Sequence, residues 1–394
     1  PTRPLGWIGT ASTEWNVGEN WAKGNVPDEN TEIVYISKTN NQPVISSEVK
    51  LTGKIELVYG VKLTIAEGGS LSIDANNITF GTDSSIVVDG TLNSTKGFTV
   101  NSNFAGATGT FSCSDSSNPL IIDTDLELSG NLISSNGTIT INSGKNVTCN
   151  SISAATLENN GNLTLNDDSS IGNLSINETI KIDSGKKLFV SGSNVTLGNI
   201  EGTIELIGST DLLYLNLSKT SAGVDTIIVN KEKDENENDK NVKFSKRQTQ
   251  TSKIKTVVVE SGITTFDTPI EIENFSTSEN AGDITFSNNT TIKNACEINS
   301  KNTVSFGSDE NSTTTFGTEE NPVNFTHPAG QTNIKGSLTA NDIALAETSI
   351  SGTVTANDIN CGNTTITGNV VAKKIILAEN TIEGTVTGTE ITLG

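Results

Sequence analysis

The sequence predicts an all-β protein, a parallel β-helix (β-solenoid) with three-sided rungs of about 16–21 residues and an N-terminal cap. The first of three observations is that glycine recurs every sixteen residues, at Gly336, Gly352, Gly368 and Gly384. Aliphatic residues share this period, and no long segment has the apolar spacing of an amphipathic helix. A short fixed period indicates one structural unit stacked on copies of itself.

The cross-section follows from the columns of the repeat. Four columns are apolar: Leu338, Val354, Val370 and Val386; Ile343, Ile359, Ile375 and Ile391; Leu345, Cys361, Leu377 and Leu393; Ile350, Ile366 and Ile382. Two columns are small: Ala340, Ala356, Ala372 and Gly388; Ala346, Gly362, Ala378 and Gly394. Inward positions fall in three pairs, each two residues apart, which places both members on one face of a strand. Sixteen residues therefore make one circuit of three short strands, and rungs stack about 4.8 Å apart.

Residues 1–48 form a different segment, which contains Trp7, Trp15 and Trp21. A solenoid needs its first rung covered, because an open end exposes apolar side chains and an unpaired strand edge. Large aromatic rings outside the repeat suit such a cap. The alternative is an exposed aromatic platform that binds carbohydrate.

This segment resembles the start of many bacterial cell-surface β-helix proteins, a "W…S..WN...NW..G..P" pattern ahead of the helix proper. The matching residues are Trp7, Ser12, Trp15, Asn16, Asn20, Trp21, Gly24 and Pro27. The resemblance covers about thirty residues. It implies an exported surface protein and no particular activity.

Residues 49–230 predict a solenoid with longer rungs. The stretch Ile65–Ile73 has echoes at Ile141–Cys149 and Ile182–Val190. These offsets fit whole numbers of rungs of roughly nineteen to twenty-one residues. The prism is therefore expected to narrow toward the C-terminus.

Residues 231–252 interrupt the pattern with a run of charged and amide side chains. Such a run predicts a solvated loop extruded between rungs, dispensable for folding. A hinge between two solenoids is the alternative. Residues 253–394 then continue the solenoid, with regular sixteen-residue rungs from 336, and several phenylalanines replace aliphatic residues on the way.

Composition limits the partners. The net charge is −21 and the pI about 4.4, which argues against nucleic acid and against anionic membrane surfaces. No apolar segment has the length needed to span a membrane, so no membrane insertion is expected. A chain that begins at Pro1 is what a secreted protein looks like after signal removal, and equally what a trimmed protein looks like.

Candidate chemistry is sparse. His327, the only histidine, lies in a turn-like sequence and cannot alone supply a zinc site. Asp167 with Asp168, and Asp83 with Asp89, are the candidate carboxylate pairs for a polysaccharide lyase or hydrolase. We predict no catalytic, cofactor-binding or metal-binding residue, and at most weak calcium binding at acidic turns.

The four cysteines, Cys113, Cys149, Cys296 and Cys361, form no CxxC motif and are expected to be buried core thiols.

As a whole, the chain is similar in architecture and composition to autotransporter passengers and filamentous-haemagglutinin-type adhesins. That resemblance implies an extracellular protein of the bacterial cell surface, a non-catalytic stiff rod for adhesion or display. Its partners would be a host or cell-surface ligand. The alternative is a filament or sheath subunit whose partner is itself, joined end to end, because the repeat runs to Gly394 without a visible cap.

Overall fold

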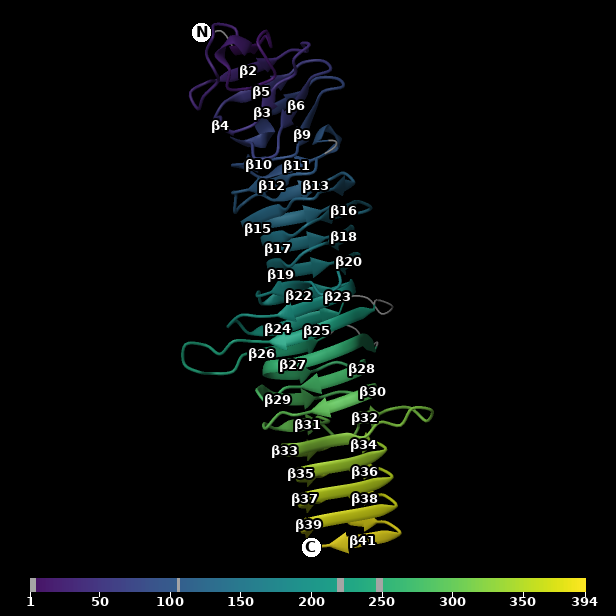
Figure 1. Cartoon of the computed structure of the whole chain (residues 1–394). Coiled ribbons are helices and arrows are strands. Elements are labelled where there is room, and N and C mark those ends of the chain that lie inside the picture. The colour runs from purple at the N-terminus through teal and green to yellow at the C-terminus, as the bar shows by residue number, and fades with distance from the viewer. Residues whose placement is uncertain (1–4, 105–106, 218–222, 246–250) are drawn as a thin grey trace. The chain divides into compact units, whose positions relative to one another are not determined.

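A computed structural model describes residues 5–104, 107–217, 223–245 and 251–394 (Figure 1). These residues form parallel strands that pair rung to rung, a β-solenoid of about 17 turns, so the predicted fold class is confirmed. The helices of the described part are short 3-10 turns, η1 (Gly18–Asn20), η2 (Ala75–Asn77) and η3 (Ser102–Phe104). The chain divides into two compact units, described separately below: an N-terminal unit of residues 1–172 and 176–186, and a C-terminal unit of residues 173–175 and 187–394.

Three sheets form the sides of the first rungs in the N-terminal unit. The first sheet contains β1 (Leu5–Trp7), β2 (Ile33–Ile36), β5 (Lys54–Leu57) and β8 (Ile78–Phe80). The second contains β3 (Val44–Ile45), β6 (Lys62–Ile65) and β9 (Ser85–Val88). The third begins with β4 (Glu48–Lys50), β7 (Ser70–Ile73) and β10 (Thr91–Ser94). Alternate residues point inward, as Ile55 and Leu57 do in β5, because successive side chains of a strand face opposite ways.

Further strands follow in the same unit. They are β11 (Phe98–Val100), β12 (Thr110–Cys113), β13 (Leu120–Ile122), β14 (Leu126–Glu127), β15 (Leu132–Ile141), β16 (Asn146–Cys149), β17 (Ile152–Asn159), β18 (Asn162–Leu165) and β20 (Thr179–Ile182), while β19 (Ser169–Ile176) belongs to both units. Strand β15 pairs with both β12 and β13, so it runs along two sides of its rung. The offset between paired residues varies from Ile55↔Ile78 to Asn146↔Asn162, a wider range than the expected nineteen to twenty-one. Turns differ in length, and the pairing of β15 with β17 shifts register between Ser134 and Thr138.

The C-terminal unit continues the same pattern. Its upper strands are β21 (Lys187–Val190), β22 (Asn194–Leu197), β23 (Asn199–Leu206), β24 (Leu212–Leu217), β25 (Val224–Asn230), β26 (Asn241–Ser245), β27 (Ser252–Phe266), β28 (Ile270–Thr277), β29 (Ala281–Phe286), β30 (Thr290–Ile298), β31 (Val304–Phe306), β32 (Thr313–Phe316) and β33 (Phe325–Ile334). Its last strands are β34 (Ser337–Thr339), β35 (Asp342–Ile350), β36 (Thr353–Thr355), β37 (Asp358–Ile366), β38 (Asn369–Val371), β39 (Lys374–Ile382), β40 (Thr385–Thr387) and β41 (Glu390–Leu393).

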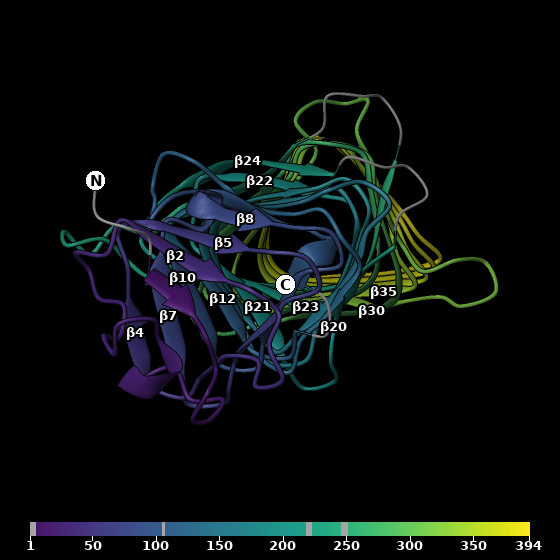
Figure 2. The same ribbon diagram turned by 90° about the horizontal axis from the view of Figure 1, so that it is seen from above.

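The last rungs keep the sixteen-residue register residue by residue. Ile359 pairs with Ile375, and both side chains are buried, as the repeat predicted. Each nine-residue strand covers two sides of the rung, and a small residue stands where the sides meet. A Cβ on Gly362 would come 2.3 Å from the carbonyl oxygen of Ala346, so the stack leaves no room for one. In Figure 2 these yellow-green strands lie over one another.

A column of phenylalanines fills the core above these rungs. Phe244, Phe266, Phe286 and Phe306 occupy paired positions on successive rungs. Their rings stack with centroids 4.6, 4.7 and 5.2 Å apart. The phenylalanines noted in the sequence therefore form one aromatic ladder, which contributes about 0.5–1.5 kcal/mol per pair beyond area burial.

The charged segment 231–252 is a shorter loop than expected. The exposed part projects beside β26 in Figure 1, but Lys231, Val242 and Phe244 are buried. Residues 246–250 lie outside the described part of the chain. Strand β25 pairs with β27 across the loop, as in Ile227↔Val257, so parallel pairing continues past this segment.

Candidate functional site

The three tryptophans of the cap pack on one another and are buried. The ring centroids of Trp7 and Trp21 are 5.0 Å apart, and those of Trp15 and Trp21 are 4.7 Å apart, both edge to face. Trp21 donates from Nε1 to the carbonyl oxygen of Trp15 at 2.7 Å. Each ring is at most 3% exposed, so the alternative of an exposed carbohydrate-binding platform is wrong.

Asn20 fixes the loop between these rings. Its Oδ1 accepts hydrogen bonds from the backbone N–H groups of Ala11 and Ser12, and its Nδ2 donates to Ser12 Oγ and to the carbonyl oxygen of Glu14. The side chain is fully buried, so these four hydrogen bonds replace the water that its amide group would bind if exposed. This network gives a physical reason for the Asn-Trp pair in the segment.

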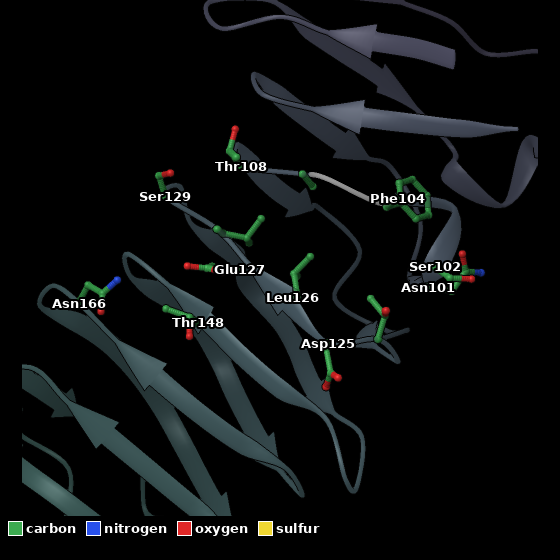
Figure 3. A pocket seen from close by; sticks show the side chains of 13 residues that line it. Asn101, Ser102, Phe104, Thr108, Asp125, Leu126, Glu127, Ser129, Thr148 and Asn166 are labelled. Carbon is green, nitrogen blue, oxygen red and sulfur yellow. The ribbon is translucent and has the colours of Figure 1, made fainter. Parts of the chain in front are cut away.

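A pocket of about 650 Å³ lies on one side of the N-terminal unit (Figure 3). Strand β9 is followed on this side by η3 and residues 107–108, and then by the short strand β14, which pairs with β16. On this side of the solenoid, the 3-10 turn η3 thus lies between β9 and β14 in space, where other rungs have a strand. The apolar floor of the pocket consists of Phe104, Leu126 and Leu128.

The pocket rim is polar and partly acidic. Asp125 accepts hydrogen bonds from the backbone N–H and the Nδ2 of Asn146 through one oxygen, Oδ1, at 2.8 and 3.2 Å. Glu127, two residues on and exposed, projects from β14. The rim can accept hydrogen bonds from a hydroxylated ligand. Sequence reasoning missed this pocket, because it depends on which side of one rung lacks a strand.

The predicted carboxylate candidates are not among the residues that line this pocket, although Asp89 and Asp167 adjoin its lining residues Thr108 and Asn166. Asp167 forms an ion pair with Lys186, with 2.6 Å between Oδ1 and Nζ. The hydrogen bond from Lys186 lowers the pKa of Asp167, so this carboxyl stays ionised. Asp83 lies in a left-handed turn before β9 and Asp89 follows that strand, so the extended strand separates them. Asp89 accepts a hydrogen bond from Thr108 at 2.7 Å.

His327 lies in the core and not in a turn. Within β33 it pairs with Leu345, so it occupies the column that Leu345, Cys361 and Leu377 continue. The side chain is fully buried. Burial lowers its pKa, which keeps the ring neutral. The turn-like sequence 325–330 lies within β33, whose pairing with β35 shifts register between His327 and Gln331.

All four cysteines are free thiols. Three of them, Cys113, Cys149 and Cys361, are buried as predicted. The fourth, Cys296, is half-buried. Burial raises the pKa of Cys149 to about 12 and that of Cys361 to about 11. These thiols are therefore unreactive at neutral pH.

Neither a metal-binding cluster nor a membrane-spanning helix is found among the residues that the structure describes. Within them, no group of three or more His, Cys, Asp or Glu side chains is placed to hold a metal ion. No helix of the described ranges is long and apolar enough to cross a membrane.

The fold defines a class, the parallel β-solenoid repeat proteins. A family model described as "Domain of unknown function (DUF8693)" matches residues 6–103, which include the tryptophan cap and the first rungs. No curated protein and no solved structure matches the chain.

Proposed function

We propose that this chain is a non-catalytic, extracellular structural protein of the bacterial cell surface, a stiff solenoid rod for adhesion or display. The observation that supports this best is the continuous register of the last rungs, where Asp342↔Asp358, Asp358↔Lys374 and Lys374↔Glu390 follow without a shift. Every rung there is tied to its neighbours by backbone hydrogen bonds over buried aliphatic ladders, which resists bending.

The charge supports the same role. A net charge of −21 keeps a protein with exposed strand edges soluble through mutual repulsion. The outward positions of the solenoid are mostly Asn, Thr, Ser and Asp, whose side chains bond from rung to rung. Asn162 Nδ2 donates to Asn146 Oδ1 at 3.0 Å, and Asn341 Nδ2 donates to Asn324 Oδ1 at 2.8 Å.

A filament or sheath subunit is the second candidate. Strand β41 pairs with β39 along one edge, and Ile391 and Leu393 are 43% and 53% exposed. A strand of a second copy in the same register would cover both side chains. This contact would be promoted by salt, since repulsion between acidic chains is screened.

Negative-stain imaging of the 394-residue chain, together with sedimentation, tests the proposal across protein and salt concentration. Single elongated particles at every concentration support the solitary rod. Strings that lengthen with salt or calcium support the filament instead. Compact spherical particles would contradict both candidates.

A further inference from the structure

One side of the last rungs carries two ranks of outward-facing, mostly threonine side chains, called here the threonine face. The central residue of each short strand, such as Leu338, Val354 or Val370, is buried, so its two neighbours point outward. The threonine face consists of Thr313, Thr315, Ser337, Thr339, Thr353, Thr355, Asn369, Val371, Thr385 and Thr387.

The two ranks are ordered in both directions. Along each strand the two outward residues are roughly 6.6 Å apart, twice the rise per residue. From rung to rung the spacing is about 4.8 Å. The pairings Ser337↔Thr353, Thr353↔Asn369 and Asn369↔Thr385 show no shift of register. The result is a regular two-dimensional array of outward side chains.

Charge is excluded from this array. None of its ten side chains is ionisable, although the chain carries −21. The neighbouring side of the same rungs bears the charged column Asp342, Asp358, Lys374 and Glu390. The exposed Val371, 43% accessible, adds an apolar group among the hydroxyls and methyls of the face.

The dimensions of the array favour one kind of ligand. A charge-free lattice of hydroxyl and methyl groups is complementary to a solid surface that itself repeats in two dimensions. Crystalline polysaccharide would favour aromatic rings for stacking, and the ten residues include none.

We propose that the threonine face binds ice. Its two spacings are close to the two oxygen repeat distances on a prism face of hexagonal ice. Methyl groups would order the water between the ranks, and hydroxyl groups would join that water to the lattice. This inference is independent of the surface role proposed above.

Partitioning of the purified 394-residue chain into a slowly growing ice shell tests the proposal, with ice recrystallisation measured in parallel. Thr355→Lys puts a large charge in the middle of the face. Thr365→Lys is the matched control, because Thr365 is exposed on another side of the same rung. Circular dichroism verifies that both variants fold.

We expect the unmodified chain and T365K to enter the ice and to slow recrystallisation, and T355K to lose both properties. Exclusion of the unmodified chain from ice, like that of a non-binding protein, would overturn the proposal. Equal loss in T365K and T355K would overturn the assignment to this face. Binding to cellulose or chitin particles without entry into ice would show a polysaccharide ligand instead.

Discussion

His327 and Thr332 are hydrogen-bonded inside the solenoid, with 2.8 Å between Nδ1 and Oγ1. The other ring nitrogen, Nε2, lies 2.9 Å from the carbonyl oxygen of Ser300. A carbonyl oxygen only accepts, so Nε2 carries the proton and Nδ1 accepts from the hydroxyl of Thr332. Both nitrogens of the neutral ring are satisfied in this way, while burial, and not the bond to Ser300, lowers its pKa.

This arrangement makes stability depend on pH. Burial lowers the folded pKa of His327 below its ordinary value of 6.5. The unfolded chain therefore binds a proton at a higher pH than the folded chain, and stability falls as pH drops below about 6.5. Urea unfolding at pH 7.5 and 5.5 should show a loss that is smaller in His327→Leu. An equal loss in both proteins would contradict the buried, neutral ring.

Lys231 makes the stability of the fold depend on pH in the alkaline range as well. Its Nζ donates to the carbonyl oxygen of Ile207 at 2.7 Å, and burial lowers its pKa to about 8. Between pH 8 and 10.5 the unfolded chain binds more protons, so stability rises with pH across that window, by on the order of 3 kcal/mol. The rise should be absent from Lys231→Met. Denaturant titrations at pH 7.5 and 10 measure it, and parallel curves for the two proteins would show Lys231 to be solvated.

The isoleucine column gives a direct test of the register. Ile375→Asp buries an unpaired charge and should cost several kcal/mol. Ile376→Asp, one residue on, changes a half-exposed outward side chain and should cost well under 1 kcal/mol. Thermal unfolding of both variants compares them. A small effect of Ile375→Asp would mean that the predicted column is wrong.

The loop at 232–239 should be dispensable, in contrast to the strand that follows it. Replacing 232–239 with a short Gly-Ser linker should change stability little, because most of these side chains are exposed. Phe244→Ala should cost about 3–5 kcal/mol, since Phe244 is buried and stacks on Phe266 at 4.6 Å. Chemical unfolding of both variants measures the difference. A strongly destabilised loop variant would show that 232–239 is packed.

Periodicity predicted the last rungs well, because each position there repeats the same environment every sixteen residues. The burial of Ile359 and Ile375 follows directly from it. The same pattern did not predict that His327 is buried. Its sequence is turn-like, but it lies in a core strand that shifts register between His327 and Gln331. The sequence indicated an exposed Lys231 within a charged run. Its burial depends on a hydrogen bond to the backbone carbonyl of Ile207, which composition does not reveal.

The candidate pocket was beyond sequence reasoning for a different reason. Asp125 and Glu127 share a face of the chain by their spacing, but they border a pocket because η3 occupies the place of a strand next to β14. Nothing in the residues around Phe104 indicates that replacement. The cap tryptophans were predicted as buried, since large rings outside a repeat gain most by covering it.

The proposal of a surface protein is tested most directly on intact cells that produce the chain. A glutamate-specific protease, added outside the cells, should cut the exposed loop at Glu235 or Glu237 and release fragments of the expected sizes. Immunoblotting before and after cell lysis follows the cleavage. Cleavage is expected while the cells remain intact. A chain that is cut only after lysis would contradict an extracellular surface role.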